Sequence, residues 1–197
     1  SDLLAVLGCV IGGITVTGLN PDSQQGDKVI LDILKRCGGK FKPVEGGLHF
    51  DRSLLKATEI DLADCPDLGP ILFTLGCFCS GETVIRNAGR LRLKESDRIE
   101  AMQTELRKMG ARIEVDGDTV HIQGVALHAP NAPLSGHNDH RIVMALAVAA
   151  IASGLPALLC GAEAVDKSWP AFWSVLRGLG AKVELNTDKQ EEFDIKA

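Results

Sequence analysis

Residues 94–98 place lysine, glutamate, serine, aspartate and arginine in an unbroken polar row. The row lies between an apolar alternation at Leu91 and Leu93 and a helical pattern that begins at Ile99. Cations at the start of a helix favour phosphate or carboxylate binding, because a helix N-terminus offers unpaired N–H groups and a partial positive charge. A solvated turn is the alternative interpretation of the same row.

Three more polar clusters lie directly before predicted helices, at residues 65–67, 137–141 and 166–168. Helices in equivalent places of a repeat point the same way, so we expect their N-terminal ends to gather on one face. That face would concentrate positive charge on a chain whose formal net charge is −5. We therefore expect a site for a phosphate or carboxylate. The cations around it would be Lys94, Arg98, Arg141 and Lys167.

Each cluster also has a purely structural interpretation. Asp97 and Glu100 match a helix-capping pair. Asn138 or Asp139 can serve as the N-cap of the next helix. A lone histidine such as His140 is more often packed or hydrogen-bonded than catalytic. The recurrence of polar clusters at several helix starts favours a functional site over these alternatives.

Two carboxylates, Asp67 and Glu95, lie beside these cations in the sequence. If an anionic ligand neutralises the cations, the carboxylates are free for proton transfer. One could accept a proton and the other donate one, if their surroundings separate their pKa values. The residues themselves leave open which carboxylate does which.

The elements that would position these residues repeat along the chain with a period of about 70 residues. The units, at residues 1–54, 55–124 and 125–197, each contain a short apolar strand, a polar loop and an amphipathic helix. A glycine follows each amphipathic helix, where it supplies the left-handed conformation that ends a helix. These glycines are Gly38, Gly110 and Gly180.

Two kinds of helix alternate within the units. Helices that are apolar around the whole wheel are expected to be buried. They are predicted at 3–11, 68–79 and 142–152. Helices with one polar face are predicted nearer solvent, at 29–37, 99–109 and 171–179. Alternating strands follow, at 112–115 with 120–123 across an Asp-Gly-Asp turn, and at 182–185 with 193–195.

The pattern predicts an α/β fold of pseudo-threefold βαβαββ repeats, with parallel helices buried inside and sheets outside. We expect a single domain over 1–197. The first unit lacks its opening strand, and the chain begins with SDLLAVLGCVIGG, which has the pattern of a buried helix already in progress. We therefore expect this chain to be one half of a larger protein.

Composition narrows the class of protein. The chain has 197 residues, is 45% hydrophobic and 24% charged, and its acidic balance argues against a nucleic-acid partner. The longest apolar run, 143–152, is far too short for a membrane span. The six cysteines form no C-x-x-C pair and no zinc-like spacing, which favours a reduced, cytoplasmic protein without a metal site.

Four motifs together resemble a known family. They are LRLKESDRI at 91–99, HNDHRIVMALAVAA at 137–150, CPDLGP at 65–70 and DKSWPAF at 166–172. They resemble the C-terminal half of the 5-enolpyruvylshikimate-3-phosphate synthases, and the likeness covers essentially the whole chain. The resemblance implies two domains of three βαβαββ units each, whose helices converge on an interdomain cleft.

The resemblance also implies a reaction. The enolpyruvyl group of phosphoenolpyruvate would pass to the 5-hydroxyl of shikimate 3-phosphate by addition and then elimination of phosphate, without a metal or organic cofactor. By matching position, Asp67 would be the base near the 5-hydroxyl and Glu95 the proton donor to the methylene carbon.

Binding roles follow from the same matching. Lys94 would contact the shikimate side. Phosphoenolpyruvate would be bound by Arg98, Arg141 and Lys167, with His140 beside them. Arg90 departs from a smaller polar residue found in some members. The remaining contacts would come from the missing N-terminal domain, so we expect this chain alone to be inactive.

Two alternatives remain. A related enolpyruvyl transferase of peptidoglycan synthesis, which acts on a nucleotide sugar, shares the fold but not the KESDR signature. The chain could also be a non-catalytic half-domain that binds anions. A second threefold unit encoded upstream would distinguish an enzyme from such a half-domain.

Overall fold

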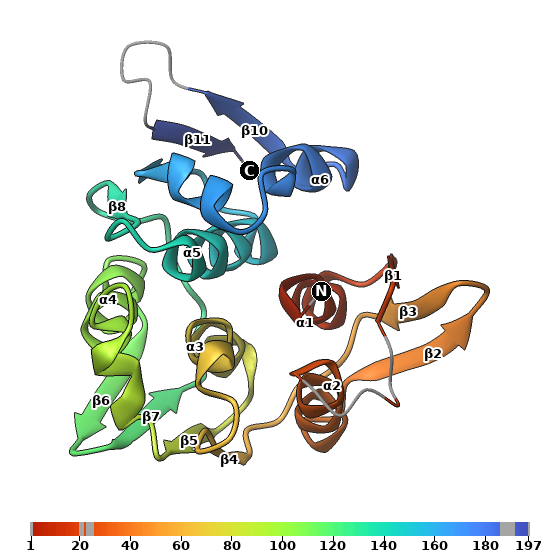
Figure 1. Ribbon diagram of the computed structural model, residues 1–197, viewed down its shortest axis with the longest axis horizontal. Coiled ribbons are helices and arrows are strands. Elements are labelled where there is room, and N and C mark those ends of the chain that lie inside the picture. The colour runs from red at the N-terminus through yellow and green to blue at the C-terminus, as the bar shows by residue number, and fades with distance from the viewer. Residues whose placement is uncertain (1, 20–21, 23–25, 186–191, 197) are drawn as a thin grey trace.

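The computed structural model describes residues 2–19, 22, 26–185 and 192–196. The polar loop expected near residue 20 falls largely outside these residues. Three helices lie at the centre and pack against one another (Figure 1). They are α1 (Asp2–Ile11), α3 (Gly69–Phe78) and α5 (His140–Ser153).

The central helices are buried because they are apolar all round. Every residue of α5 from Ile142 to Ala150 is buried, and so is every residue of α3 from Gly69 to Cys77. The hydroxyl of Thr74 on α3 donates to the carbonyl oxygen of Ala145 on α5 over 3.0 Å, so this buried polar group is satisfied. The predicted buried helices are confirmed, with ends shifted by one or two residues.

Three outer helices follow the central ones along the chain. They are α2 (Gly26–Arg36), α4 (Arg98–Arg107) and α6 (Phe172–Gly178). Short 3₁₀ helices also occur, at η1 (Pro66–Leu68), η2 (Gly89–Leu93) and η3 (Ala162–Lys167). The outer helices agree with the predicted amphipathic segments.

Three sheets form the outside of the molecule (Figure 1). The first has the order β1-β3-β2, from β1 (Ile14–Thr17), β2 (Lys40–Val44) and β3 (Gly47–Asp51). The second has the order β4-β5-β7-β6, from β4 (Glu59–Asp61), β5 (Glu82–Arg86), β6 (Arg112–Asp116) and β7 (Thr119–Gln123). The third has the order β8-β9-β11-β10, from β8 (Leu134–Ser135), β9 (Ala157–Cys160), β10 (Lys182–Leu185) and β11 (Glu192–Lys196).

The two four-stranded sheets have the same plan. In each, the leading strand is parallel to the next strand and the remaining pairs are antiparallel. Both predicted strand pairs are confirmed, with Arg112 opposite Gln123 and Lys182 opposite Lys196. Among the described residues, no helix is long and apolar enough to cross a lipid bilayer.

The glycines that follow the outer helices have the predicted conformation. Gly38, Gly110 and Gly180 have φ values of 84°, 89° and 96°. L-residues with a Cβ rarely adopt this left-handed region. Each outer helix therefore ends where the sequence places a residue that can turn the chain toward the following strand.

Candidate functional site

Helix ends bring the sequence-predicted residues together. Asp67 lies in η1 before α3, Lys94 and Glu95 lie between η2 and α4, and Lys167 ends η3. The predicted site residues form two groups of contacts that adjoin along the chain, since Lys94 precedes Glu95 and Asp139 precedes His140. Asp67 and Asp139 link Lys94, Arg98 and Arg141 in the first group. Glu95 contacts His140 and Lys167 in the second.

Asp67 is shared by three cations. Its Oδ1 lies 3.4 Å from Lys94 Nζ and 3.3 Å from Arg98 Nη1. The guanidinium of Arg141 donates to the Asp67 carbonyl oxygen over 3.0 Å. Burial disfavours the charged carboxylate, but Arg141, Lys94 and Arg98 outweigh it and hold the Asp67 pKa below its ordinary value. Asp67 is therefore ionised at neutral pH, as a proton acceptor must be.

Arg98 is buried with a partner that the sequence interpretation treated only as a helix cap. Its side chain is 3% exposed and that of Asp139 is 0% exposed. Arg98 Nε and Nη2 donate to the two Asp139 oxygens over 2.8 and 3.2 Å. Asp139 is also the N-cap of α5, since it accepts from Arg141 N over 3.0 Å. One carboxylate therefore starts α5 and fixes Arg98 of α4.

Ser96 completes the Asp139 site, and its hydroxyl donates to Asp139 Oδ2 over 2.9 Å. Burial opposes ionisation of Asp139, but the hydrogen bonds from Arg98 and Ser96 prevail, and its pKa lies below the ordinary value. Of the two caps that the sequence allowed for α5, the structure selects Asp139 over Asn138. At α4, Asp97 accepts from Glu100 N over 3.1 Å, so the predicted cap is confirmed.

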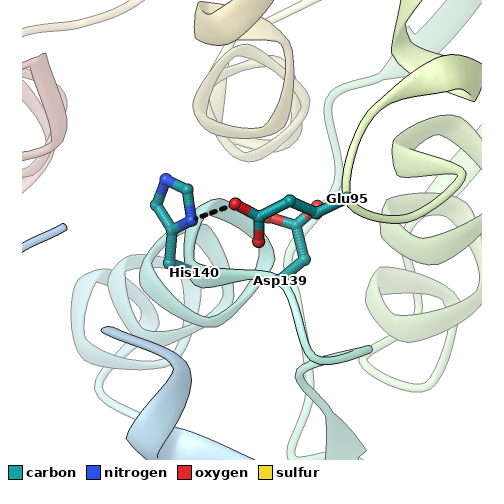
Figure 2. A group of neighbouring side chains, drawn as sticks. All are labelled: Glu95, Asp139 and His140. Atoms are coloured by element: carbon teal, nitrogen blue, oxygen red, sulfur yellow. Dashed lines mark ion pairs between the residues drawn. The ribbon is translucent and has the colours of Figure 1, made fainter. Parts of the chain in front are cut away.

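Glu95 lies between two positively charged or ionisable partners. Its Oε1 lies 3.0 Å from Nδ1 of His140, and its Oε2 lies 3.4 Å from Nζ of Lys167 (Figure 2 shows the histidine contact). His140 Nδ1 is buried and has no partner with hydrogen-bond geometry, so the Glu95 contact is close but poorly aligned.

Glu95, Asp139 and His140 come close enough for one metal ion to touch all of them (Figure 2). The donor set argues against a resident cation. The Asp139 oxygens already accept from Arg98, Ser96 and the Arg141 amide. The nearby ammonium of Lys167 and guanidinium of Arg98 would repel a divalent ion. The group is better described as part of an ion-pair network.

The cations of this site differ in their access to solvent. The side chains of Lys94, Arg141 and Lys167 are 28%, 31% and 42% exposed. Lys167 Nζ also donates to the backbone and side-chain oxygens of Asn138 over 2.6 and 3.2 Å. These three cations are open to solvent, whereas Arg98 is buried and its Nη1 donates to Asp67.

A cavity of about 480 Å³ opens on one side of Asp67 and Arg141. Its wall also carries Asp2, Asp27 and Asp64, so carboxylates outnumber the single arginine. An anion would be repelled there.

The comparisons with known proteins agree on one family. A sequence profile of EPSP synthase (3-phosphoshikimate 1-carboxyvinyltransferase) matches residues 3–176. A 3-phosphoshikimate 1-carboxyvinyltransferase of Clostridium acetobutylicum is 44% identical over 176 residues, which are 89% of this chain and 40% of that protein. The enzyme of the same name from Methanocaldococcus jannaschii is 39% identical over 186 residues, covering 94% and 43%. This chain therefore spans about two fifths of the length of these relatives.

Solved structures agree with the fold. EPSP synthase from Acinetobacter baumannii superposes with a TM-score of 0.74 at 25% identity, over 90% of this chain and 44% of that one. The enolpyruvyl transferase NikO from Streptomyces tendae superposes with a TM-score of 0.75 at 22% identity, over 92% of this chain and 42% of that one. At this identity the likeness shows the fold alone. The mixed α/β fold is therefore that of enolpyruvyl transferases.

Proposed function

Because the chain belongs to the EPSP synthase (3-phosphoshikimate 1-carboxyvinyltransferase) family of shikimate-pathway transferases, we propose that it supplies one side of an enolpyruvyl-transfer site. The donor is phosphoenolpyruvate and the acceptor is the 5-hydroxyl of shikimate 3-phosphate. The observation that carries this proposal is the meeting of Lys94, Arg141 and Lys167 around two accessible carboxylates. Transfer from phosphoenolpyruvate needs both anion recognition and proton transfer.

Each carboxylate has a role that fits its surroundings. Asp67, whose pKa is lowered, accepts the proton of the attacking hydroxyl. Glu95 donates a proton to the methylene carbon, with His140 and Lys167 holding its two oxygens. Lys94 beside Asp67 contacts the acceptor.

Phosphoenolpyruvate binds to the remaining cations, Arg98, Arg141 and Lys167, with His140 beside them. Lys167 and Arg141 reach the ligand from η3 and α5, while Arg98 contributes its Nη1 edge. An anion that displaces Glu95 from Lys167 would free that carboxylate for proton transfer. The arrangement requires neither a metal nor an organic cofactor among the described residues.

We also propose a domain architecture for the chain. Residues 1–197 form one domain of three related units, 1–54, 55–124 and 125–197, on a βαβαββ plan with pseudo-threefold symmetry. The matching strand orders of the sheets support this plan. The domain is the carboxyl-terminal half of a cytoplasmic two-domain enzyme, and the cleft between the halves holds the substrates.

The test is phosphate release from phosphoenolpyruvate and shikimate 3-phosphate, measured with this chain alone and after mixing with a separately expressed amino-terminal half of the C. acetobutylicum relative. The chain alone should be inactive. The reason is that the other half would supply the remaining hydrogen bonds to the substrates. Loss of three such charge-assisted bonds costs about 4.5–9 kcal/mol of substrate binding, at roughly 1.5–3 kcal/mol each.

Activity that appears only on mixing would support the proposal. The control for contaminating enzyme is a mixture that contains Asp67→Asn in place of the wild-type chain. Turnover by the chain alone would refute the division of the site between two halves. Phosphoenolpyruvate binding with no turnover in any mixture would instead identify an anion-binding domain without catalysis.

A further inference from the structure

Glu105 is a buried carboxylate that has no part in the proposed chemistry. It lies on α4 two turns beyond Arg98 and is 1% exposed. Its oxygens contact Lys108 Nζ at 2.7 Å, His137 Nε2 at 3.0 Å and the Ser135 amide nitrogen at 3.1 Å. A charge is rarely buried unless it is fully paired, so this group must be held for a reason within the fold.

Two of those partners, Ser135 and His137, belong to a strained turn. His137 and Asn138 have φ values of 51° and 52°, in the left-handed region that residues with a Cβ disfavour. Consecutive residues persist there only when their surroundings hold them. Glu105 contacts the turn at two points, the Ser135 amide and the His137 ring. Ser135 Oγ also accepts from the His137 amide over 3.2 Å.

The same turn carries acceptors of the anion site. Asn138 binds the ammonium of Lys167 through its carbonyl and side-chain oxygens. Asp139, the next residue, holds Arg98 and caps α5. If the turn relaxed to ordinary dihedral angles, both acceptors would move, and Lys167 and Arg98 would lose their orientation.

We propose that Glu105 is a positioning residue, which holds the turn 135–139 left-handed so that Lys167 and Arg98 face the anion. The inference rests on the proposed function for the identity of the anion. Glu105 does not touch the ligand. It acts through His137 and Ser135, from the far end of the helix whose first residue is Arg98.

The test compares the wild-type chain with Glu105→Gln, which keeps size and removes charge. In ligand-free protein, three-bond amide–α-proton couplings of His137 and Asn138 report φ, and the Arg98 Nε–H signal reports its bond to Asp139. Both should change in Glu105→Gln. The dissociation constant for phosphoenolpyruvate, from an NMR titration, should rise about tenfold, equivalent to about 1.4 kcal/mol.

A second substitution separates positioning from mere stability. Glycine adopts positive φ freely, so Glu105→Gln/His137→Gly should restore the left-handed turn and most of the affinity for phosphoenolpyruvate. The matched control is Lys108→Gln, which removes the opposite charge of the same pair. It should lower stability and leave the couplings at 137 and 138 and the dissociation constant unchanged.

Unchanged couplings and an unchanged Arg98 signal in folded Glu105→Gln would overturn the inference, whatever the wild type binds. Where the wild type binds phosphoenolpyruvate, failure of Glu105→Gln/His137→Gly to restore affinity would also overturn it. If Glu105→Gln unfolds, Glu105→Gln/Lys108→Gln carries the same test without the Lys108 ammonium, whose carboxylate partner has been removed. A wild type that binds no phosphoenolpyruvate, while these signals still respond, would count against the proposed function and not against Glu105.

Discussion

Asp67 and Glu95 occupy different surroundings although both lie among cations. Asp67 has three cationic neighbours and a lowered pKa, and Glu95 contacts one lysine and lies beside a histidine whose Nδ1 lacks an aligned partner. The lowered Asp67 pKa suits an acceptor of protons, and the proposed function gives the donor role to Glu95. The roles assigned to the two residues can therefore be tested separately.

We expect Asp67→Asn and Glu95→Gln each to lower kcat by about 10²–10⁴-fold in the reconstituted two-half enzyme, because each removes acid–base function and keeps size. Steady-state phosphate release measures the effect. The control is Asp118→Asn, which changes an exposed carboxylate that pairs with Arg92 and has no role in the proposed site, and it should leave kcat unchanged. Near-wild-type turnover in both variants, with normal folding, would contradict the assignment.

At the scale of elements, two glycines at the end of α6 differ in backbone conformation and have equal space around them. A Cβ added at Gly178 or at Gly180 would meet no atom within 4 Å. Gly178 is the last residue of α6, whereas Gly180 has a φ of 96°. Because a Cβ has equal space at the two positions, backbone conformation decides how an alanine there changes the free energy of unfolding.

We expect Gly178→Ala to stabilise the chain by about 0.5–1 kcal/mol, the difference between alanine and glycine in a helix. Gly180→Ala should destabilise it by about 1–2 kcal/mol, because alanine resists the left-handed region. Urea denaturation of the two variants measures both changes. Effects of the same sign at 178 and 180 would show that the conformational explanation of the helix ends is wrong.

At the scale of the whole molecule, the Arg98–Asp139 pair joins α4 to the central helix α5. The Asp139 pKa is lowered in the folded chain, so the folded state binds fewer protons than the unfolded state in acid. Its contribution to stability is therefore present above the unfolded pKa, near 3.9, and is lost as pH falls through the lower folded value.

We expect the free energy of unfolding, measured in urea, to fall steeply below about pH 4. Asp139→Asn should destabilise the chain at pH 7 by about 3–5 kcal/mol, because it leaves Arg98 buried without its charge partner. The free energy of unfolding of Asp139→Asn should fall less steeply with decreasing pH than that of the wild type. Measurements in 1 M salt, which screens exposed pairs such as Glu184–Lys196, isolate the buried pair. Parallel pH profiles for wild type and variant would contradict this account.

The sequence by itself determined much of the architecture, and it predicted residues that the structure brings together. Apolar residues on every side of 142–150 specify a buried helix, and Gly110 specifies where α4 must end, because these are local properties of the chain. The polar row at 94–98 predicted a site at a helix start, and its residues do meet Asp67, His140 and Lys167.

Tertiary structure alone decided how the charges pair. Asp139 reads as an ordinary helix cap, and nothing near it in the sequence indicates that Arg98, forty-one residues away, is buried against it. Glu105 likewise has the pattern of an outer helix residue, yet it is buried against Ser135 and His137. Periodicity specifies which face of a helix is apolar. It does not specify which distant polar groups are buried together, because that depends on how separate elements pack and on the cost of leaving a buried charge unpaired.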